Sequence, residues 1–299
     1  MKKHYTNILV VLFAFGLMLA GGCDNTPTET ENYQPEPLLS AYIYNGEAVE
    51  EVWLEHVAPL YGFYTPENNG IPNSEITIFE VGGDDTLHFQ PDPAQPTSGR
   101  YVPADGDELI PRSLRRYRIE VTTPQGEFLW SESVMPDKMV NVGVVLVDED
   151  GNVTQVADGD TLNRSMPNMY WGWETVDSSG GYQGIITTLV DIDSLEGLNP
   201  EWKPEDLPEM PVERIRSKWM TMRYDQQQII LPWLFFEWVG PHRIELYAIS
   251  TEYYDYLRSV QMLNSGMINH PQYNVTGGLG VFGTISKYSM NIYMERVEL

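Results

Sequence analysis

The stretch that decides the fold class is residues 38–57, LLSAYIYNGEAVEEVWLEHV. Residues 38–44 combine Leu, Ile and Tyr in a run typical of a strand, and Asn45-Gly46 behind them is a strong turn signal. Residues 49–57 roughly alternate between apolar and polar side chains, which predicts the next strand. The stretch therefore predicts β structure, and the chain that follows repeats the pattern.

Similar short strands are predicted up to residue 137. Alternating or aromatic-rich runs occur between clusters of Gly, Pro and Asn, at residues 75–81, 86–89, 115–122 and 127–134. No helical periodicity interrupts them. Strands of this length and spacing predict an immunoglobulin-like antiparallel β-sandwich over residues 38–137.

Residues 138–299 predict a second antiparallel β domain, either a sandwich or a partial barrel. Its strand patterns lie at residues 142–147, 152–156, 169–175, 184–191, 216–223, 228–238, 242–250, 281–282 and 288–297. Pro232 stands inside the apolar run 228–238. Because proline donates no backbone hydrogen bond, it predicts an edge strand, a bulge or a break.

One helix is predicted, over residues 252–263. Ser250 or Thr251 can accept hydrogen bonds from its first free N–H groups, and Glu252 suits the positive end of the helix dipole. One face carries apolar and aromatic side chains at helical spacing, and we expect it to pack against the sheet: Tyr253, Tyr256, Leu257, Val260 and Leu263.

The first 23 residues have the layout of a bacterial lipoprotein signal. Lys2 and Lys3 precede an apolar run of about a dozen residues, too short for the roughly 20 that span a bilayer. The run ends in LAGGC, so we expect residues 1–22 to be removed and Cys23 to carry a membrane-anchoring lipid. An ordinary signal peptide with an incidental cysteine is the alternative, because Ala20 stands where lipoprotein signals usually have Leu.

Residues 23–37 are polar, acidic and proline-containing, which predicts a flexible tether. Acidic residues this close to Cys23 also resemble surface-export tags of some lipoproteins, and a plain solvated linker is equally compatible with them.

Charge restricts the class of partner. The chain has 43 acidic and 18 basic side chains and a net charge of −25, and loss of Lys2 and Lys3 with the signal brings it to −27. Nucleic acid and anionic lipid headgroups repel such a surface, so we expect neither as a partner. Cys23 is the one cysteine, so an acylated chain forms no disulfide and its core alone must hold the fold.

No motif indicates a catalytic or metal site. Residues 278–283 spell G-x-G-x-x-G, but too little chain follows for a dinucleotide-binding unit, and we expect these glycines to allow positive φ or close backbone approach. Asp148, Asp150 and Gly151 resemble the start of a calcium loop without its later ligands, which favours a hairpin turn. The histidines lack metal-ligand spacing and no nucleophile motif occurs, so we expect no metal, no cofactor and no enzymatic activity.

Three tryptophans are candidates for ligand binding. Trp171 and Trp173 stand two apart in a predicted strand and share a face, which favours the core for both. Trp202 lies in an acidic, proline-rich excursion, residues 193–211, whose length is typical of a binding loop or a mobile one. It is therefore the candidate ligand-binding residue, because an exposed indole can stack on a sugar ring.

With both ends of the chain considered, the sequence resembles a lipoprotein family of the Bacteroidota known as domain of unknown function 4249. The resemblance rests on LLSAYIYNGEAVEEVWLEHVAPLY, NSEITIFEVGG and YRIEVTTPQGEFLWSESVMP in the front part, and on ISTEYYDYLRSVQM and VTGGLGVFG near the end. It implies an envelope lipoprotein, often encoded beside an outer-membrane transporter of the TonB-dependent kind. It implies no activity and no site residues.

These observations favour a lipid-anchored protein of the cell envelope, on the outer membrane, that acts as a non-catalytic accessory or ligand-capture module of such a transporter. A surface glycan-binding protein that uses Trp202 is the alternative. A secreted hydrolase is a further one, which a cleft of convergent carboxylates would support.

Overall fold

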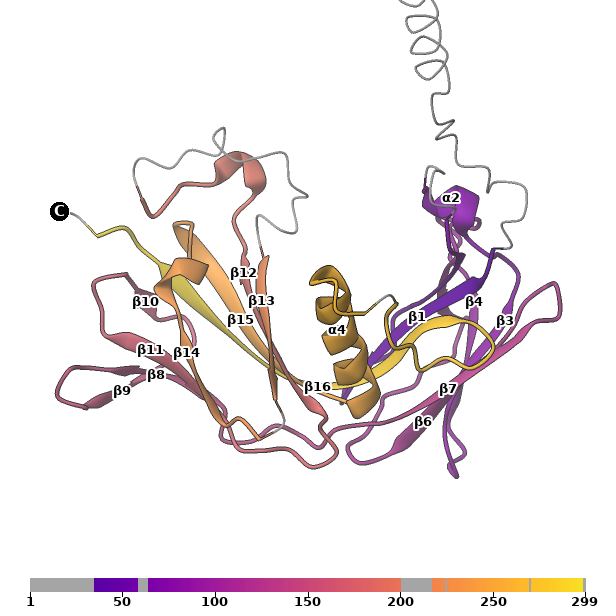
Figure 1. The fold of residues 1–299 in the computed structure, drawn as a ribbon, viewed down its shortest axis with the longest axis horizontal. Helices are drawn as coiled ribbons and strands as arrows, with labels where there is room; N and C mark the ends of the chain where they lie inside the picture. The colour runs from indigo at the N-terminus through magenta and orange to yellow at the C-terminus, as the bar shows by residue number, and fades with distance from the viewer. Residues whose placement is uncertain (1–34, 59–63, 200–216, 224, 269, 298–299) are drawn as a thin grey trace, which may run out of the picture. The chain divides into compact units, whose positions relative to one another are not determined.

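One strand, β16 (Leu279–Met294), links most of the β structure (Figure 1). Its first part, up to Ile285, pairs in parallel with β1 (Pro37–Tyr44), and from Ile285 onward it pairs antiparallel with β15 (Gly240–Ile249). The two pairings join strands of both halves of the described chain into one 12-stranded sheet. A second sheet has four strands.

The computed structural model describes residues 35–58, 64–199, 217–223, 225–268 and 270–297. Cys23 and Trp202, the two site residues predicted from the sequence, lie outside these ranges, as do the signal and most of the tether. In the described part of the chain, no helix is long and apolar enough to cross a membrane.

The first half is built on β1, whose side chains alternate between the core and the opposite face. Its strands follow one another in the order β16-β1-β2-β5-β4-β3-β6-β7. A one-turn helix, α2 (Pro66–Asn69), lies in a stretch for which no element was predicted. The remaining strands are β2 (Val52–His56), β3 (Glu75–Glu80), β4 (Thr86–Pro91), β5 (Arg100–Pro103), β6 (Arg116–Thr122) and β7 (Phe128–Val134).

β7, the last strand of this series, is hydrogen-bonded to β16, the first, and to the segment just before it. Trp130 of β7 and Thr276 exchange backbone hydrogen bonds of 3.0 and 2.8 Å, and Thr284 of β16 donates its hydroxyl to the Val134 carbonyl at 2.8 Å. The layers enclose one hydrophobic core, to which β1, β2, β3, β5, β6 and β16 contribute Leu39, Leu54, Ile78, Tyr101, Ile119 and Phe282.

The second half places four strands of the large sheet opposite the small one. In the large sheet, β16 pairs with β15, β15 pairs with β12 (Gly181–Thr188), and β12 pairs with β13 (Ser217–Arg223). β10 (Thr161–Leu162) pairs with the end of β16. The small sheet has the order β14-β11-β8-β9, with β8 (Gly143–Val147), β9 (Val153–Val156), β11 (Asn168–Gly172) and β14 (Gln228–Leu231). The described parts of its connections contain the 3₁₀ turns η1 (Ile192–Ser194) and η3 (Trp233–Phe235).

A second hydrophobic core lies between these strands. Both sheets contribute to it, with Val144, Trp171, Tyr182, Leu246 and Met290 among the buried residues. The prediction that the chain is mainly β, with one substantial helix, is confirmed for the residues that the structure describes. The described residues within 36–58 and 64–299 nevertheless group as one compact unit, and the boundary expected between residues 137 and 138 stays a prediction.

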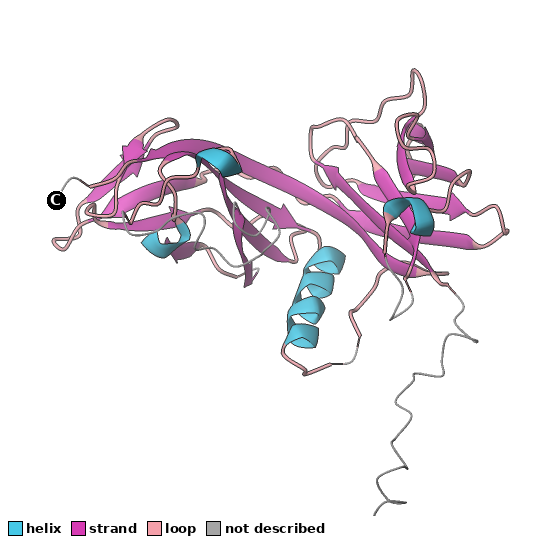
Figure 2. Ribbon diagram, turned by 90° about the horizontal axis from the view of Figure 1, so that it is seen from above, coloured by secondary structure: helices cyan, strands magenta, loops and turns pink. Residues whose placement is uncertain are grey.

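The helix α4 (Thr251–Asn264) packs on the outer face of the large sheet, where Figure 2 shows it beside the strands. Gly181 of β12 leaves room for the Tyr254 ring, and Gly283 of β16 leaves room for Tyr253, whose atoms a Cβ at Gly283 would approach to 3.0–3.2 Å. Tyr254 is buried, whereas the face predicted to pack is only half-buried.

The prediction for β16 was wrong: the sequence predicted separate strands at residues 281–282 and 288–297, and the structure has one continuous strand there. The interruption is the polar stretch Thr284, Ser286 and Lys287, and each of these side chains has a partner. The predicted effect of Pro232 is confirmed: β14 ends at Leu231 and is an edge strand. Two strand pairs, β1–β16 and β10–β16, are parallel, which the prediction of antiparallel domains did not include.

Candidate functional site: a tyrosine-lined groove

The outward face of β1 carries Ser40, Tyr42 and Tyr44. Strand alternation sends Leu39, Ala41 and Ile43 into the first core, so these three polar or aromatic side chains point the other way. No second sheet covers this face in the described chain. It lies next to α4, and residues from the neighbouring strands complete a concave site.

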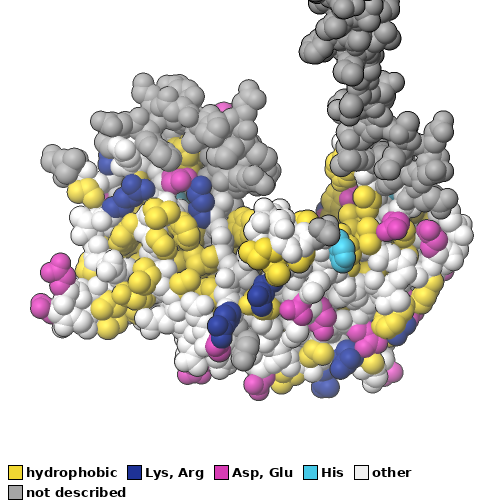
Figure 3. Space-filling model, in the orientation of Figure 1, with side chains coloured by type: hydrophobic (Ala, Val, Ile, Leu, Met, Phe, Trp, Pro, Cys, Tyr) yellow, Lys and Arg dark blue, Asp and Glu magenta, His cyan; other side chains and the backbone are white. Residues whose placement is uncertain are grey.

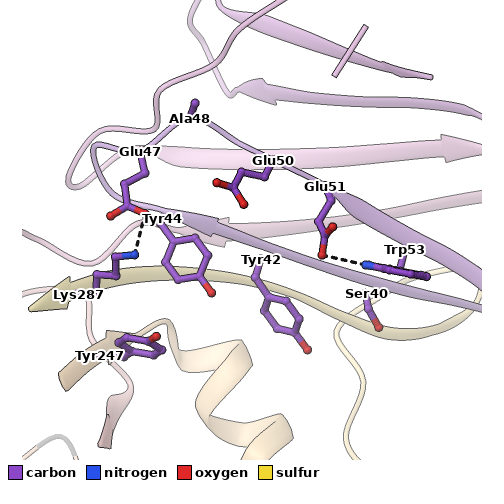
Figure 4. Close-up of a pocket in the computed structure, with 10 residues that line it drawn as sticks. All are labelled: Ser40, Tyr42, Tyr44, Glu47, Ala48, Glu50, Glu51, Trp53, Tyr247 and Lys287. Atoms are coloured by element: carbon purple, nitrogen blue, oxygen red, sulfur yellow. Dashed lines mark hydrogen bonds and ion pairs between the residues drawn. The ribbon is translucent and has the colours of Figure 1, made fainter. Parts of the chain in front are cut away.

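We call this site the tyrosine groove; it has a volume of about 300 Å³. Figure 4 shows Tyr42 and Tyr44 side by side, with Tyr247 of β15 across from Tyr44 and Lys287 of β16 at one end. The turn between β1 and β2 provides carboxylates along the other wall. The complete lining is Ser40, Tyr42, Tyr44, Glu47, Ala48, Glu50, Glu51, Trp53, Tyr247 and Lys287.

The rings of the groove contact one another and the helix. Tyr44 and Tyr247 meet edge to face with centroids 6.2 Å apart, and Tyr42 meets Tyr253 of α4 at 5.0 Å in a tilted arrangement. Offset and edge-on geometries are the favourable ones for aromatic pairs. The rings are therefore held in place by packing.

Two of the three glutamates that line the groove are held in ion pairs. Glu47 pairs with Lys287, oxygen to ammonium, at 2.8 Å, and Glu51 pairs with Arg100 at 2.7 Å. Glu51 also accepts a hydrogen bond from the Trp53 indole at 3.0 Å. No such ion pair or hydrogen bond holds the Glu50 side chain among the described residues, and Figure 4 shows Glu50 between its two neighbours, above the rings.

The Lys287 ammonium lies over an aromatic face. Its nitrogen is 5.0 Å from the centroid of the Tyr44 ring, within the distance at which a cation is attracted by a ring's negative face. The groove thus brings together aromatic faces, carboxylates and one internal cation.

The phenols of the groove stay protonated. Burial raises the pKa of Tyr42, with Tyr253 adding to the effect, and burial followed by the charge of Glu245 raises the pKa of both Tyr44 and Tyr247. Low polarity and nearby negative charge both oppose formation of a phenolate. These hydroxyls are therefore neutral hydrogen-bonding groups at ordinary pH, and negative charge in the groove comes from carboxylates.

A second cavity, of about 370 Å³, lies beside η3 and is lined by Arg164, Asn199, Trp233, Leu234 and Glu237. Its charged groups have partners: Arg164 donates to the Phe236 carbonyl at 2.6 Å, and Glu237 pairs with Lys218 at 2.9 Å. Figure 3 shows hydrophobic side chains gathered over β14 on this side of the molecule, where Ile230 is 51% exposed and Leu234 is 65% exposed.

The structure explains the roles of several sequence motifs. Trp171 and Trp173 are buried in the second core, as predicted. Gly280 has a positive φ of 113° and lies directly against the Leu39 backbone, so the glycine run serves close strand packing, also as predicted. Asp148 accepts hydrogen bonds from Asp150 and Asn152 within the turn between β8 and β9, and these bonds hold the pKa of its carboxyl below the usual range. In the described chain, no three His, Cys, Asp or Glu side chains are placed to hold a metal ion.

The tyrosine groove was not predicted from the sequence. A usable signal existed, because Tyr42 and Tyr44 alternate with core residues and must face outward. The contributions of Tyr247 and Lys287 had no local signal, since they reach Tyr44 through the pairing of β16 with both β1 and β15.

Comparison with family models gives one assignment. The model described as Domain of unknown function (DUF4249) matches residues 25–290. The chain belongs to this family. The resemblance seen in the sequence is thereby confirmed, whereas an origin in the Bacteroidota stays a prediction. The description of DUF4249 names no activity, and no curated protein matches the chain.

Among solved structures, the chain is similar to the FN1–FN3 domains of chicken CNTN1 at 9% sequence identity. The match covers 86% of this chain but only 64% of that one, with a TM-score of 0.26.

Proposed function

We propose that this DUF4249 chain is a lipid-anchored, non-catalytic protein of the cell envelope that captures a ligand in the tyrosine groove for an outer-membrane transporter of the TonB-dependent kind. The observation that carries the proposal is the groove itself. It is concave, its aromatic rings are held by packing, and its polar groups converge, which are general features of a ligand site. The anchor rests on the signal pattern that ends at Cys23.

The groove supports binding better than catalysis. Three carboxylates converge there, which is the feature that would favour a hydrolase. However, Glu47 and Glu51 are each neutralised by a cation, so Glu50 is left without the partner carboxylate that glycoside hydrolysis uses. The phenols, whose pKa values are raised, stay protonated and therefore provide no general base, and the described lining residues include no histidine.

Crosslinked co-purification from native membranes tests the assignment. A tag after Leu299 retrieves the lipidated mature chain, which begins at Cys23, and a Cys23→Ser form is the control. Recovery of an outer-membrane barrel with the wild type but not with the control is the expected result. Recovery of the protein alone, together with failure to retain any envelope nutrient, would overturn the accessory function.

A surface glycan-binding protein is the second candidate, because Trp53, Tyr42 and Tyr247 provide ring faces and hydroxyl donors in one groove. A glycan array separates the two predicted positions. Loss of a glycan signal in Tyr42→Ala but not in Trp202→Ala would assign glycan binding to the groove, and the reverse pattern would assign it to Trp202.

A further inference from the structure

We propose that the ligand of the tyrosine groove is a small organic cation, a protonated amine or quaternary ammonium, held by the faces of Tyr42, Tyr44 and Tyr247 and by the Glu50 carboxylate. This inference rests on the proposed ligand-capture function and specifies its ligand class.

The charge of the groove favours a cation. Pairing of Glu47 with Lys287 and of Glu51 with Arg100 cancels two negative charges, and Glu50 remains. Glu245, on the same face of β15 as Tyr247, adds negative charge near the rings; after burial, its charge raises the pKa of both Tyr44 and Tyr247. An anionic ligand would be repelled, and the net charge of −25 on the whole chain acts in the same direction.

The rings favour a cation as well. Lys287 already places its ammonium 5.0 Å from the Tyr44 centroid while it pairs with Glu47, so the protein itself provides an example of an ammonium between a tyrosine face and a carboxylate. Clusters of aromatic faces recognise ammonium ligands through the same attraction, which gains strength when the site is partly shielded from water. A free ammonium beside Glu50 would meet the same two kinds of group.

The internal cation gives the inference a specific consequence. Lys287 neutralises Glu47 and covers one face of Tyr44, so it competes with an external cation for both groups. Removing its charge in Lys287→Met leaves a more negative groove and frees that ring face. A cationic ligand gains from both changes and binds more tightly, whereas a neutral ligand gains at most the ring face and nothing from the added negative charge.

The test uses the lipidated mature protein, which begins at Cys23, in detergent and two probes of nearly the same shape. Choline carries a quaternary nitrogen, and 3,3-dimethylbutan-1-ol has carbon in its place. Isothermal titration calorimetry is expected to show choline binding about tenfold more tightly than the alcohol, which corresponds to about 1.4 kcal/mol, within the range of cation–π attraction. Equal affinities, or no binding of choline, would overturn the inference.

Variants locate the site. Glu50→Gln is expected to weaken choline binding several-fold, and Glu75→Gln, which removes an exposed carboxylate from β3, is its matched control with wild-type affinity. Lys287→Met should tighten choline binding and Lys287→Arg should leave it near the wild-type value, with thermal unfolding as the check that each variant is folded. Weaker binding in a folded Lys287→Met protein would contradict the proposed competition.

The same titrations separate this inference from the function on which it rests. A neutral oligosaccharide that binds in wild type but not in Tyr42→Ala, with choline inactive, would overturn the cation and leave ligand capture in place. Failure of both probes and of glycans, combined with recovery of no transporter, would remove both.

Discussion

His242 shows at the scale of one residue how the fold changes ionisation. Its ring is 1% exposed, packs edge-on against Phe236 and hydrogen-bonds the Gly240 carbonyl at 2.9 Å through Nδ1. Burial lowers the pKa of this imidazole, because a charged ring would lose its hydration inside the second core. The folded protein therefore holds His242 neutral at pH values where the unfolded chain protonates it.

This difference predicts a loss of stability in acid. Below about pH 6.5, the ordinary histidine pKa, the unfolded state binds a proton that the folded state does not, so the free energy of unfolding falls as pH decreases. The slope from this residue is at most about 1.4 kcal/mol per pH unit and ends at the lowered pKa of the folded state. Urea titrations from pH 7.5 to 5 should show a shallower decline for His242→Gln. His270→Gln, which removes an exposed imidazole, should follow the wild type, and an unchanged slope in His242→Gln would refute the assignment.

At the scale of elements, β16 depends on glycine where it meets β1. Gly280 has a φ of 113°, and a Cβ there would overlap the Leu39 carbonyl oxygen. The parallel pairing of β1 with β16, and with it the position of Lys287 beside Tyr44, therefore requires a residue without a side chain at this position.

Gly280→Ala is expected to be more damaging than a glycine substitution in an open turn. Gly46→Ala is the matched control, because Gly46 also has a positive φ, 77°, but no atom lies within 4 Å of the added Cβ. The control should lose about 1–2 kcal/mol from backbone strain alone. Gly280→Ala should lose more, or fail to fold, in urea unfolding followed by tryptophan fluorescence. Equal losses would mean that the contact with Leu39 carries no cost.

The helix α4 is an element whose existence was predictable and whose orientation was not. Its spacing of apolar residues predicted residues 252–263, close to the observed Thr251–Asn264. The face it buries was predicted less well, because the space for Tyr254 comes from Gly181, on a strand far away in the sequence. Close approach at a distant glycine leaves no trace in the periodicity of the helix itself.

At the scale of the whole molecule, the proposed attachment to a membrane depends on one atom, the sulfur of Cys23. We predict that a palmitate analogue supplied to growing cells labels the wild type, that the protein then sediments with membranes, and that Cys23→Ser loses both properties. A labelled Cys23→Ser protein, or an unlabelled wild type, would contradict lipidation. A single acyl chain anchors a protein only marginally, whereas several chains anchor it stably through apolar contacts that salt does not screen. We therefore expect the protein to sediment with membranes even at high salt.

The sequence by itself determined what depends on neighbours along the chain. Strand-forming residue types and the Asn45-Gly46 turn signal marked β1, an alternating or aromatic-rich run marked β6, helical spacing marked α4, and Pro232 marked the end of β14. The signal pattern before Cys23 is equally local. Only the tertiary structure decided that β16 is one strand and that it joins β1 to β15, because every extended segment offers the same backbone donors and acceptors to any partner. The tyrosine groove follows from that pairing. Tyr44 lies on β1, more than two hundred residues before Tyr247 on β15 and Lys287 on β16. Only the register of β16 with both of its neighbours brings the three side chains within reach of one ligand.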